Sequence, residues 1–345
     1  MKVKFSNTYI GDEEEVFIIA EIGVNHNGDI NLAKKMIKEA AKTGVNAVKF
    51  QTFIAEDMLT ENARKAKYQE KNTTEPSQLE MIKTLELSED DFIELSKYAD
   101  SNNVLFLSSP FDKKSVDILD KLNVPGFKIG SGELNNFELL EYIESKGKPI
   151  IISTGMATLE EIQETFDFIT NKDKLIILHC ITGYPSKIED ANLKFITTLK
   201  DKFNVPIGFS DHSSAIELAI ASIGLGACVI EKHFTIDKTL DGPDHEASLE
   251  PKEFKAMVDA IRNVEIAMGD GKRRLCESEL EIKKVARKSI IAKVDIPKGS
   301  ILDSSMLIIK RPGTGIEPKY LKSLFGKKAK VDMKKDDLIK YDFLE

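Results

Sequence analysis

The sequence predicts an α/β fold, a (β/α)8 TIM barrel followed by a small β-rich domain. First, eight short, apolar, β-branched segments alternate with segments of helical periodicity, which is the order of elements in such a barrel. Second, polar or charged residues stand at the C-terminal end of every one of these eight segments. Third, the pattern changes after residue 270 to short strand-like runs broken by turns.

The elements of the barrel follow from these runs. We expect the strands at 16–22, 47–51, 104–109, 127–130, 149–154, 175–180, 205–210 and 228–233. Amphipathic helices are expected at 32–42, 113–122, 138–146, 159–170, 191–203 and 215–223, and a last one at 251–268 opens with proline, a favoured first helical residue. The stretch 52–87 has no clear period, so we expect an irregular loop that acts as a lid.

These runs predict three parts of the chain. Residues 1–270 form the catalytic barrel, 271–286 a linker, and 287–345 the small domain. A charged helical bridge is expected at 277–288, followed by short strands at 289–292, 295–299 and 306–311. A domain of roughly 60 residues is marginal alone, so we expect it to pack against another surface.

Composition excludes several classes of protein. The 345 residues carry a net charge of −8 and no tryptophan, and Lys and Glu are interspersed, so a nucleic-acid binder is not expected. No run reaches the roughly 18 apolar residues of a membrane span, and the N-terminus has no secretory pattern. The three cysteines are too few and too far apart for a disulfide framework, which favours a cytoplasmic protein.

The residues at the strand ends share one chemistry. Two lysines, Lys49 and Lys128, would lie in an enclosed barrel mouth, where unpaired charge is costly. Small hydroxyl donors accompany them at Ser109, Ser131, Ser153 and Ser210. Cations and hydroxyls around one cavity indicate a site for a phosphate and a carboxylate.

Two histidines, His212 and His233, end adjacent strands and could share one metal ion. Substrate and water would complete the shell of a Mn or Mg ion, whereas zinc is less favoured because no cysteine accompanies the pair. Glu21, at the end of the first strand, is a candidate acid or base, and Asp244, in the loop after the last strand, is the other.

Six barrel motifs resemble the sialic acid synthases in sequence and order. They are IAEIGVNHNG at 19–28, VKFQT at 48–52, FKIGSGE at 127–133, ISTGM at 152–156, GFSDH at 208–212 and IEKHFT at 230–235. The tail from ARKS at 286–289 through KRPGTG at 310–315 resembles the C-terminal antifreeze-protein-like domain of that family, also called the SAF domain. The resemblance covers the chain from end to end.

The resemblance implies a metal-dependent transferase that condenses phosphoenolpyruvate with an N-acylated amino-sugar aldehyde and water, releasing phosphate by C–O cleavage. It assigns phosphoenolpyruvate to Lys49, Ser109, Lys128, Ser131, Ser153, Thr182 and Ser210. It assigns the sugar to Gln51, Asn72, Tyr184, Asp244 and Arg311, the metal (Mn, with Mg or Co as alternatives) to His212 and His233, and catalysis to Glu21 and Asp244. It also implies a domain-swapped homodimer in which Arg311 reaches the other subunit's barrel.

The sequence leaves two acceptor sugars open. N-acetylmannosamine, giving N-acetylneuraminate, is the first expectation; the alternative is 2,4-diacetamido-2,4,6-trideoxymannose, giving N,N'-diacetyllegionaminic acid. Gly183 departs from the family pattern near the sugar, and the loop at 68–81 resembles members that use either acceptor. Three rivals differ in class: a Schiff-base aldolase, a phosphosugar synthase, and an inactive barrel carrying a carbohydrate-binding module.

Overall fold

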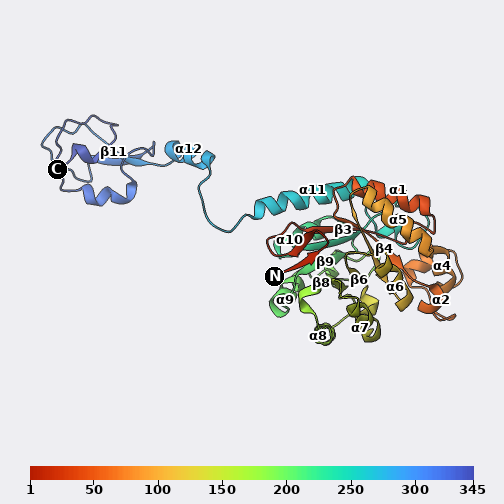
Figure 1. Ribbon diagram of the computed structural model, residues 1–345. Helices are drawn as coiled ribbons and strands as arrows, with labels where there is room; N and C mark the ends of the chain where they lie inside the picture. The colour runs from red at the N-terminus through yellow and green to blue at the C-terminus, as the bar shows by residue number, and fades with distance from the viewer. The chain divides into compact units, whose positions relative to one another are not determined.

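The structure is a computed structural model that describes residues 1–345. The chain forms two compact units, Met1–Gly269 and Asp270–Glu345 (Figure 1). Each unit has its own buried core and is described by itself.

The first unit is the predicted barrel. Its eight parallel strands are β3 (Phe17–Gly23), β4 (Ala47–Thr52), β5 (Leu105–Pro110), β6 (Phe127–Ile129), β7 (Ile150–Ser153), β8 (Leu175–Cys180), β9 (Ile207–Asp211) and β10 (Val229–His233). They pair in the order β5-β4-β3-β10-β9-β8-β7-β6, and β5 also lies beside β6 without a ladder, so the barrel is nearly closed. Every predicted barrel strand is present, with bounds within two residues of those expected.

Helices surround the strands, as Figure 1 shows. They are α1 (Ile30–Ala41), α5 (Glu89–Ser101), α6 (Lys113–Lys121), α7 (Phe137–Ser145), α8 (Leu159–Phe168), α9 (Phe195–Lys202), α10 (Glu217–Gly224) and α11 (Pro251–Met268). Single turns of 3₁₀ helix occur at Ser131–Glu133, Lys172–Lys174, Ile188–Asp190 and His245–Ala247. Helix α5 was not expected, although Ser88 and Asp91 form a capping box at its start.

The prediction of an irregular loop at 52–87 was wrong. This lid segment contains α2 (Ala55–Met58), α3 (Lys67–Asn72) and α4 (Gln78–Leu85). Each helix is too short to produce a recognisable apolar period. Their stability comes from packing of a small apolar cluster that includes Met81, Ile82 and Leu85 against Phe53.

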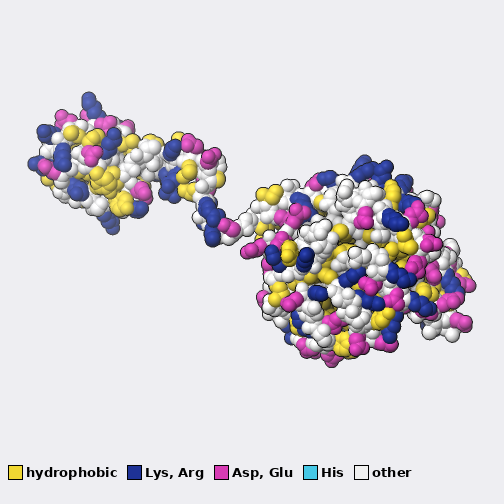
Figure 2. All heavy atoms as spheres, viewed as in Figure 1, with side chains coloured by type: hydrophobic (Ala, Val, Ile, Leu, Met, Phe, Trp, Pro, Cys, Tyr) yellow, Lys and Arg dark blue, Asp and Glu magenta, His cyan; other side chains and the backbone are white.

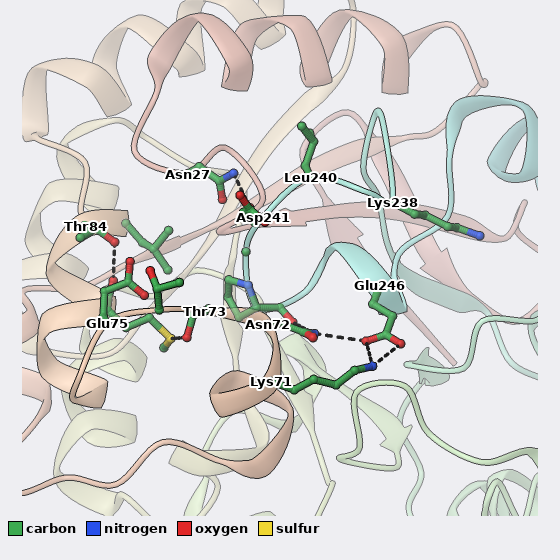
Figure 3. A pocket seen from close by; sticks show the side chains of 15 residues that line it. Asn27, Lys71, Asn72, Thr73, Glu75, Thr84, Lys238, Leu240, Asp241 and Glu246 are labelled. Atoms are coloured by element: carbon green, nitrogen blue, oxygen red, sulfur yellow. Dashed lines mark hydrogen bonds and ion pairs between the residues drawn. The ribbon is translucent and has the colours of Figure 1, made fainter.

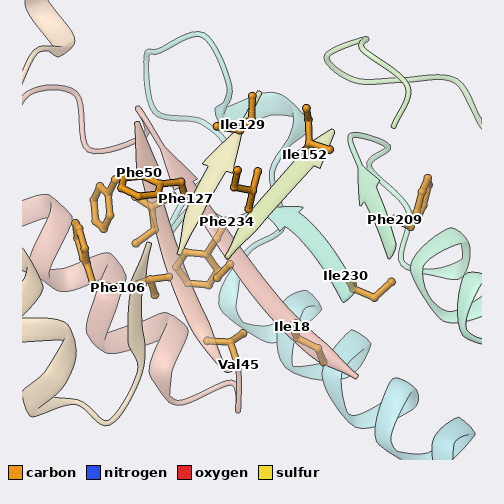
Figure 4. Close-up of a cluster of buried hydrophobic side chains, with 14 of the residues drawn as sticks. Ile18, Val45, Phe50, Phe106, Phe127, Ile129, Ile152, Phe209, Ile230 and Phe234 are labelled. Carbon is orange, nitrogen blue, oxygen red and sulfur yellow. The ribbon is translucent and has the colours of Figure 1, made fainter. Parts of the chain in front are cut away.

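Two apolar layers hold the barrel together. Residues that point outward from the strands pack against the helices; Figure 4 shows part of this layer, including Phe50 and Phe106, whose rings stack at 5.4 Å. Residues that alternate with them form a second cluster inside the barrel. An unpredicted N-terminal hairpin, β1 (Lys2–Phe5) and β2 (Thr8–Gly11), adds Phe5 and Ile10 to this inner cluster and so closes the barrel opposite the strand ends that carry the motifs.

The second unit has a small core of its own. It contains α12 (Glu277–Ala286), an antiparallel pair β11 (Ser289–Ala292) and β12 (Leu307–Lys310), and 3₁₀ turns at Pro318–Leu324 and Tyr341–Phe343. The strand predicted at 295–299 is not formed: only Ile296 makes a bridge, to Met333, and Pro297 lacks the N–H that would extend a ladder.

The surface carries charges of both signs. Figure 2 shows Lys and Arg interspersed with Asp and Glu over the visible face of the barrel unit. None of the helices combines the length and the apolar character that crossing a membrane would require.

Candidate active site

A polar cavity lies at the C-terminal end of the barrel strands, and strand alternation explains its composition. Along β3 the side chains of Phe17 and Ile19 belong to the inner apolar cluster, and Glu21 follows them on the same face. Along β10 the inward face runs from Val229 to Glu231 and then to His233. The barrel interior is therefore apolar at one end and charged at the other.

Two buried lysines lie in this cavity, each beside a hydroxyl and a carboxylate. Lys49 Nζ stands 2.7 Å from Glu21 and donates to Ser109 Oγ at 3.2 Å. Lys128 Nζ donates to Ser153 Oγ at 2.7 Å. Both side chains are almost fully buried, at 4% and 3% exposure. The ammonium groups are thus held in place before any ligand is bound.

One carboxylate links the two lysines. Glu231 lies 3.5 Å from Lys128 and 3.7 Å from Lys49, and it accepts a hydrogen bond from Ser210 Oγ at 3.0 Å. Burial opposes its charge, but the attraction of Lys128 and Lys49 is stronger and lowers the pKa of Glu231. Glu231 therefore carries its negative charge at neutral pH.

Glu21 has the opposite tendency. Burial raises the pKa of Glu21 to about 7 despite the nearby Lys49, and the negative charge of Glu231 adds to the rise. Gln51 donates to Glu21 at 3.3 Å. A carboxyl that titrates near neutrality can accept or release a proton during a reaction.

The two histidines lie together as predicted from their strands. The ring centroids of His212 and His233 are 5.3 Å apart. His212 uses Nδ1 in a 2.8 Å hydrogen bond with the Ile181 carbonyl, which leaves Nε2 without a protein partner, and the buried Nδ1 of His233 also has none. No group of three or more His, Cys, Asp or Glu side chains is arranged to hold a metal ion.

Asp244 lies beside the histidines. Its carboxylate is 3.9 Å from His233 Nδ1, and burial raises its pKa to about 6. The residue stands at the end of the loop that follows β10, directly before the 3₁₀ turn His245–Ala247. Like Glu21, it is a buried carboxyl that titrates closer to neutrality than an exposed one.

Aromatic rings connect the histidines to the lid segment. Tyr184 packs on His212 with ring centroids 4.3 Å apart, and Tyr68 of α3 packs on Tyr184 at 5.1 Å. The lid segment is also held by an ion pair, in which Lys71 of α3 lies 2.8 Å from Glu246 (Figure 3). The lid segment therefore covers one side of the cavity.

A glycine makes room for the hydroxyl groups. The backbone N–H of Gly155 donates to Ser131 Oγ at 2.9 Å. A Cβ at Gly155 would stand 2.1 Å from Thr182 Oγ1 and 2.8 Å from Ser131 Oγ. Only glycine at this position lets the two hydroxyls converge.

The cavity brings together thirteen of the fifteen predicted site residues. They are Glu21, Lys49, Gln51, Ser109, Lys128, Ser131, Ser153, Thr182, Tyr184, Ser210, His212, His233 and Asp244. Asn72 instead lines a neighbouring cavity of about 590 Å³, where its amide donates to the Glu246 carboxylate at 3.3 Å (Figure 3). Arg311 belongs to the second unit, where it is exposed and donates to the Ala286 carbonyl at 3.1 Å.

Among the residues that line the cavity, sequence reasoning assigned no role to Glu231, Cys180 or Tyr68. Glu231 shares the inward face of β10 with His233, and strand alternation is the signal that could have identified it. Cys180 ends β8 on the inward face, and its thiol lies 3.9 Å from His212 Nδ1. Tyr68 lies in the lid segment, where no strand position could place it in advance.

The chain is similar to known proteins over nearly its whole length. Residues 36–273 match the NeuB family, and residues 287–345 match the SAF domain. The N,N'-diacetyllegionaminic acid synthase of Campylobacter jejuni is 46% identical over 332 residues, covering 95% of this chain and 99% of that protein. The human N-acetylneuraminate-9-phosphate synthase is 37% identical, covering 98% and 95%. The structure of the N-acetylneuraminic acid synthetase of Leptospira borgpetersenii is similar with a TM-score of 0.74 and 38% identity, covering 81% of this chain and 94% of that one.

Proposed function

Since the chain belongs to the NeuB family, we propose that it condenses phosphoenolpyruvate with an N-acylated amino-sugar aldehyde and water, giving a nine-carbon acidic sugar and inorganic phosphate. The observation that carries this proposal is the pair of buried lysines, Lys49 and Lys128, each beside a serine hydroxyl in one cavity. Fixed ammonium groups and hydroxyls suit a substrate with both a phosphate and a carboxylate. The three free thiols fit a cytoplasmic location, which we also propose.

The lysines and hydroxyls would hold phosphoenolpyruvate. Its phosphate and carboxylate would displace Glu231 as the partner of the two ammonium groups, so binding exchanges one counter-charge for another. During the reaction C3 of phosphoenolpyruvate bonds to the aldehyde carbon, and water adds at the C2 cation. Phosphate then leaves with its bridging oxygen, and Lys49 and Lys128 offset its charge throughout.

The residues present fit a divalent metal. Nε2 of His212 and the buried Nδ1 of His233 have no hydrogen-bond partner in the protein, which is the state expected of imidazoles that are free to ligate. Mn is the first choice, with Mg and Co as alternatives, because two histidines leave most positions to oxygen ligands from water and substrate. The chemistry supplied there is Lewis-acid polarisation of the aldehyde carbonyl.

Glu21 and Asp244 would handle protons. Both carboxyls are buried and titrate near neutrality, at about 7 and about 6. Glu21 lies beside Lys49 and would take the proton of the water that adds at C2. Asp244, next to His233, would face the sugar and serve the aldehyde oxygen as it becomes a hydroxyl.

The cavity favours an unphosphorylated acceptor. Lys49 and Lys128 are the only Lys or Arg residues that line it, and both are engaged by phosphoenolpyruvate in our proposal. An apolar wall made of Val24, Met58, Ile82 and Phe111 faces the same space. We therefore favour 2,4-diacetamido-2,4,6-trideoxymannose, whose C6 methyl and second acetyl group would contact this wall. N-acetylmannosamine is the second candidate, supported by the likeness to the Leptospira enzyme.

We also propose the domain-swapped homodimer. Ten of the sixteen exposed large apolar side chains belong to the small second unit, and α12 has no buried residue at all. Such a unit gains stability by covering its apolar residues with a partner. In the dimer Arg311 would complete the sugar site of the other subunit.

Phosphate release tests the proposed function. Purified enzyme with Mn and phosphoenolpyruvate would be supplied with either of the two sugars, and the product mass recorded. We expect turnover with the diacetamido sugar above that with N-acetylmannosamine, and none after chelation or in Lys128→Met. A chelator-resistant activity that borohydride traps on a lysine would instead identify an aldolase, and turnover with neither sugar would refute the acceptor class.

Complementation tests the dimer. Lys128→Met and Arg311→Ala would be inactive alone and then co-expressed to form mixed dimers. A swapped Arg311 gives each mixed dimer one intact site, so random pairing should restore about a quarter of the parent activity. No restoration would mean that Arg311 serves its own barrel.

A further inference from the structure

The motifs that contain the two histidines also contain a buried ion pair that no substrate role explains. Asp211 is the last residue of β9 and directly precedes His212, and Lys232 precedes His233 on β10. Lys232 is 0% exposed and its ammonium lies 2.6 Å from the Asp211 carboxylate, which is 1% exposed. Neither side chain lines the cavity.

Strand alternation places this pair behind the histidines. Ser210, His212 and His233 line the cavity, whereas Phe209 and Ile230, next along the two strands, belong to the apolar layer between strands and helices. Asp211 and Lys232 share the outward face with these two residues. The charges are therefore buried in an apolar layer, where each needs every partner it has.

The partners of the pair are backbone groups of the turn that follows His212. Lys232 Nζ donates to the carbonyl oxygens of Ser213 and Ala215, at 2.8 Å for the latter, and to Ser213 Oγ at 3.2 Å. Asp211 accepts from the backbone N–H of Ser213 at 2.9 Å. One ammonium on β10 thus fastens both the end of β9 and the turn beyond it.

The register makes this fastening relevant to the histidines. Lys232 pairs directly with Asp211 in the ladder, so the residues that follow them, His233 and His212, are set side by side by the same contact. Their ring centroids are 5.3 Å apart, and sliding of one strand end against the other would change that spacing. Groups that orient metal ligands from behind affect metal affinity without touching the metal.

We infer that Asp211 and Lys232 are positioning residues that set the spacing of His212 and His233 for a divalent cation. This rests on the proposed metal role of the two histidines. A buried ion pair is weak evidence for stability, because an apolar pair of similar volume often serves as well. Its value here is geometric, since it fixes the backbone at both ligands.

The test compares Mn affinity with fold stability. The double variant Asp211→Asn/Lys232→Met removes both charges, so that neither is left buried without its counter-ion, and keeps an acceptor for the Ser213 N–H. We expect the Mn dissociation constant, followed by the paramagnetic resonance of free Mn, to rise at least tenfold in the double variant. Phosphoenolpyruvate affinity in metal-free protein should change less than twofold, because Lys49 and Lys128 are untouched.

The matched control is Ile10→Ala, at the opposite end of the barrel, where a fully buried side chain is truncated. It should lower the melting temperature without changing Mn affinity. Parent-like Mn binding by the double variant, or an equal loss in the control, would overturn the inference. The visible spectrum of bound Co gives a second readout, and its ligand-field bands should shift in the double variant alone.

Failure of the proposed function can be told apart from failure of this inference. If the His212→Ala variant binds Mn as tightly as the parent protein does, the proposed metal site itself is wrong. The imidazole ¹⁵N resonances of His212 and His233 in metal-free protein then decide the positioning role. We expect them to shift or broaden in the double variant and not in the control; unchanged resonances would refute it.

Discussion

Replacing Lys49 by methionine should destabilise the barrel strongly. Its ammonium lies 2.7 Å from Glu21 and 3.7 Å from Glu231, and all three side chains are buried. Methionine keeps most of the volume but leaves two buried carboxyls with Lys128 as the remaining cation. Removing one partner of a buried ion pair typically costs about 3–5 kcal/mol, and we expect a loss of this size at pH 8.

The loss should depend on pH in one direction. The folded-state pKa of Glu21, about 7, lies above the ordinary value of 4.5, so the stability linked to this group is complete below pH 4.5 and is lost as pH rises through 7. Without the nearby positive charge of Lys49, the folded-state pKa of Glu21 rises further. The penalty of Lys49→Met should therefore be flat below pH 7, where both proteins hold the proton, and grow by up to about 1.4 kcal/mol per pH unit above it.

Urea unfolding of metal-free protein at pH 6, 7, 8 and 9 measures this. Glu21→Gln/Lys49→Met should recover much of the loss, since it removes the stranded carboxylate. Lys113→Met, which breaks an exposed pair with Glu138, is the control and should cost less than about 1 kcal/mol at every pH. A penalty for Lys49→Met that is equal at pH 6 and pH 9, or below about 1 kcal/mol throughout, would refute this account of the cavity's charges.

Three further outcomes are expected. Gly155→Ala places a Cβ 2.1 Å from a hydroxyl oxygen of the cavity and should weaken phosphoenolpyruvate binding at least tenfold by calorimetry, whereas Gly224→Ala, with no atom within 4 Å of its Cβ, should leave it unchanged. Glu246→Gln breaks the exposed pair with Lys71 and should shift unfolding by less than about 1 kcal/mol, yet raise the KM for the sugar because the lid segment is released; an unchanged KM would exclude this role. Mn should raise the melting temperature of the parent protein but not of His233→Ala, and a rise in both would place the metal elsewhere.

The barrel and most of its site could be predicted because both depend on strand periodicity. Each strand is a short apolar run, and in a parallel barrel the residue after the run must lie at the common mouth. Lys49 and Lys128 could therefore be placed in one cavity from sequence position alone. The lid segment and the N-terminal hairpin could not, because their short elements are stabilised by contacts such as Phe5 and Ile10 with the barrel interior, which no local pattern reveals.

The local sequence pattern also could not predict which charged side chains pair with one another inside the cavity. Glu231 was visible as a carboxylate near a strand end, but its position between Lys49 and Lys128 depends on how far each strand is staggered around the barrel. That stagger decides whether the lysines carry two free charges or share one counter-ion. The structure shows the second arrangement, so the anionic substrate that we propose would compete with Glu231 for the same ammonium groups.

The motifs around the two histidines contain residues that face the cavity and residues that face the surrounding helices. A family resemblance to the whole motif therefore cannot by itself assign a role to each residue. In GFSDH and IEKHFT, alternate residues face opposite sides of one strand, so Ser210 and His212 line the cavity while Asp211 points away from it. Assigning the whole motif to substrate would credit Lys232 with binding phosphate, although its ammonium is saturated by Asp211 and backbone carbonyls. A lysine that is wholly buried behind the cavity cannot reach a ligand there, so the role that we infer for Lys232 passes through the histidine beside it.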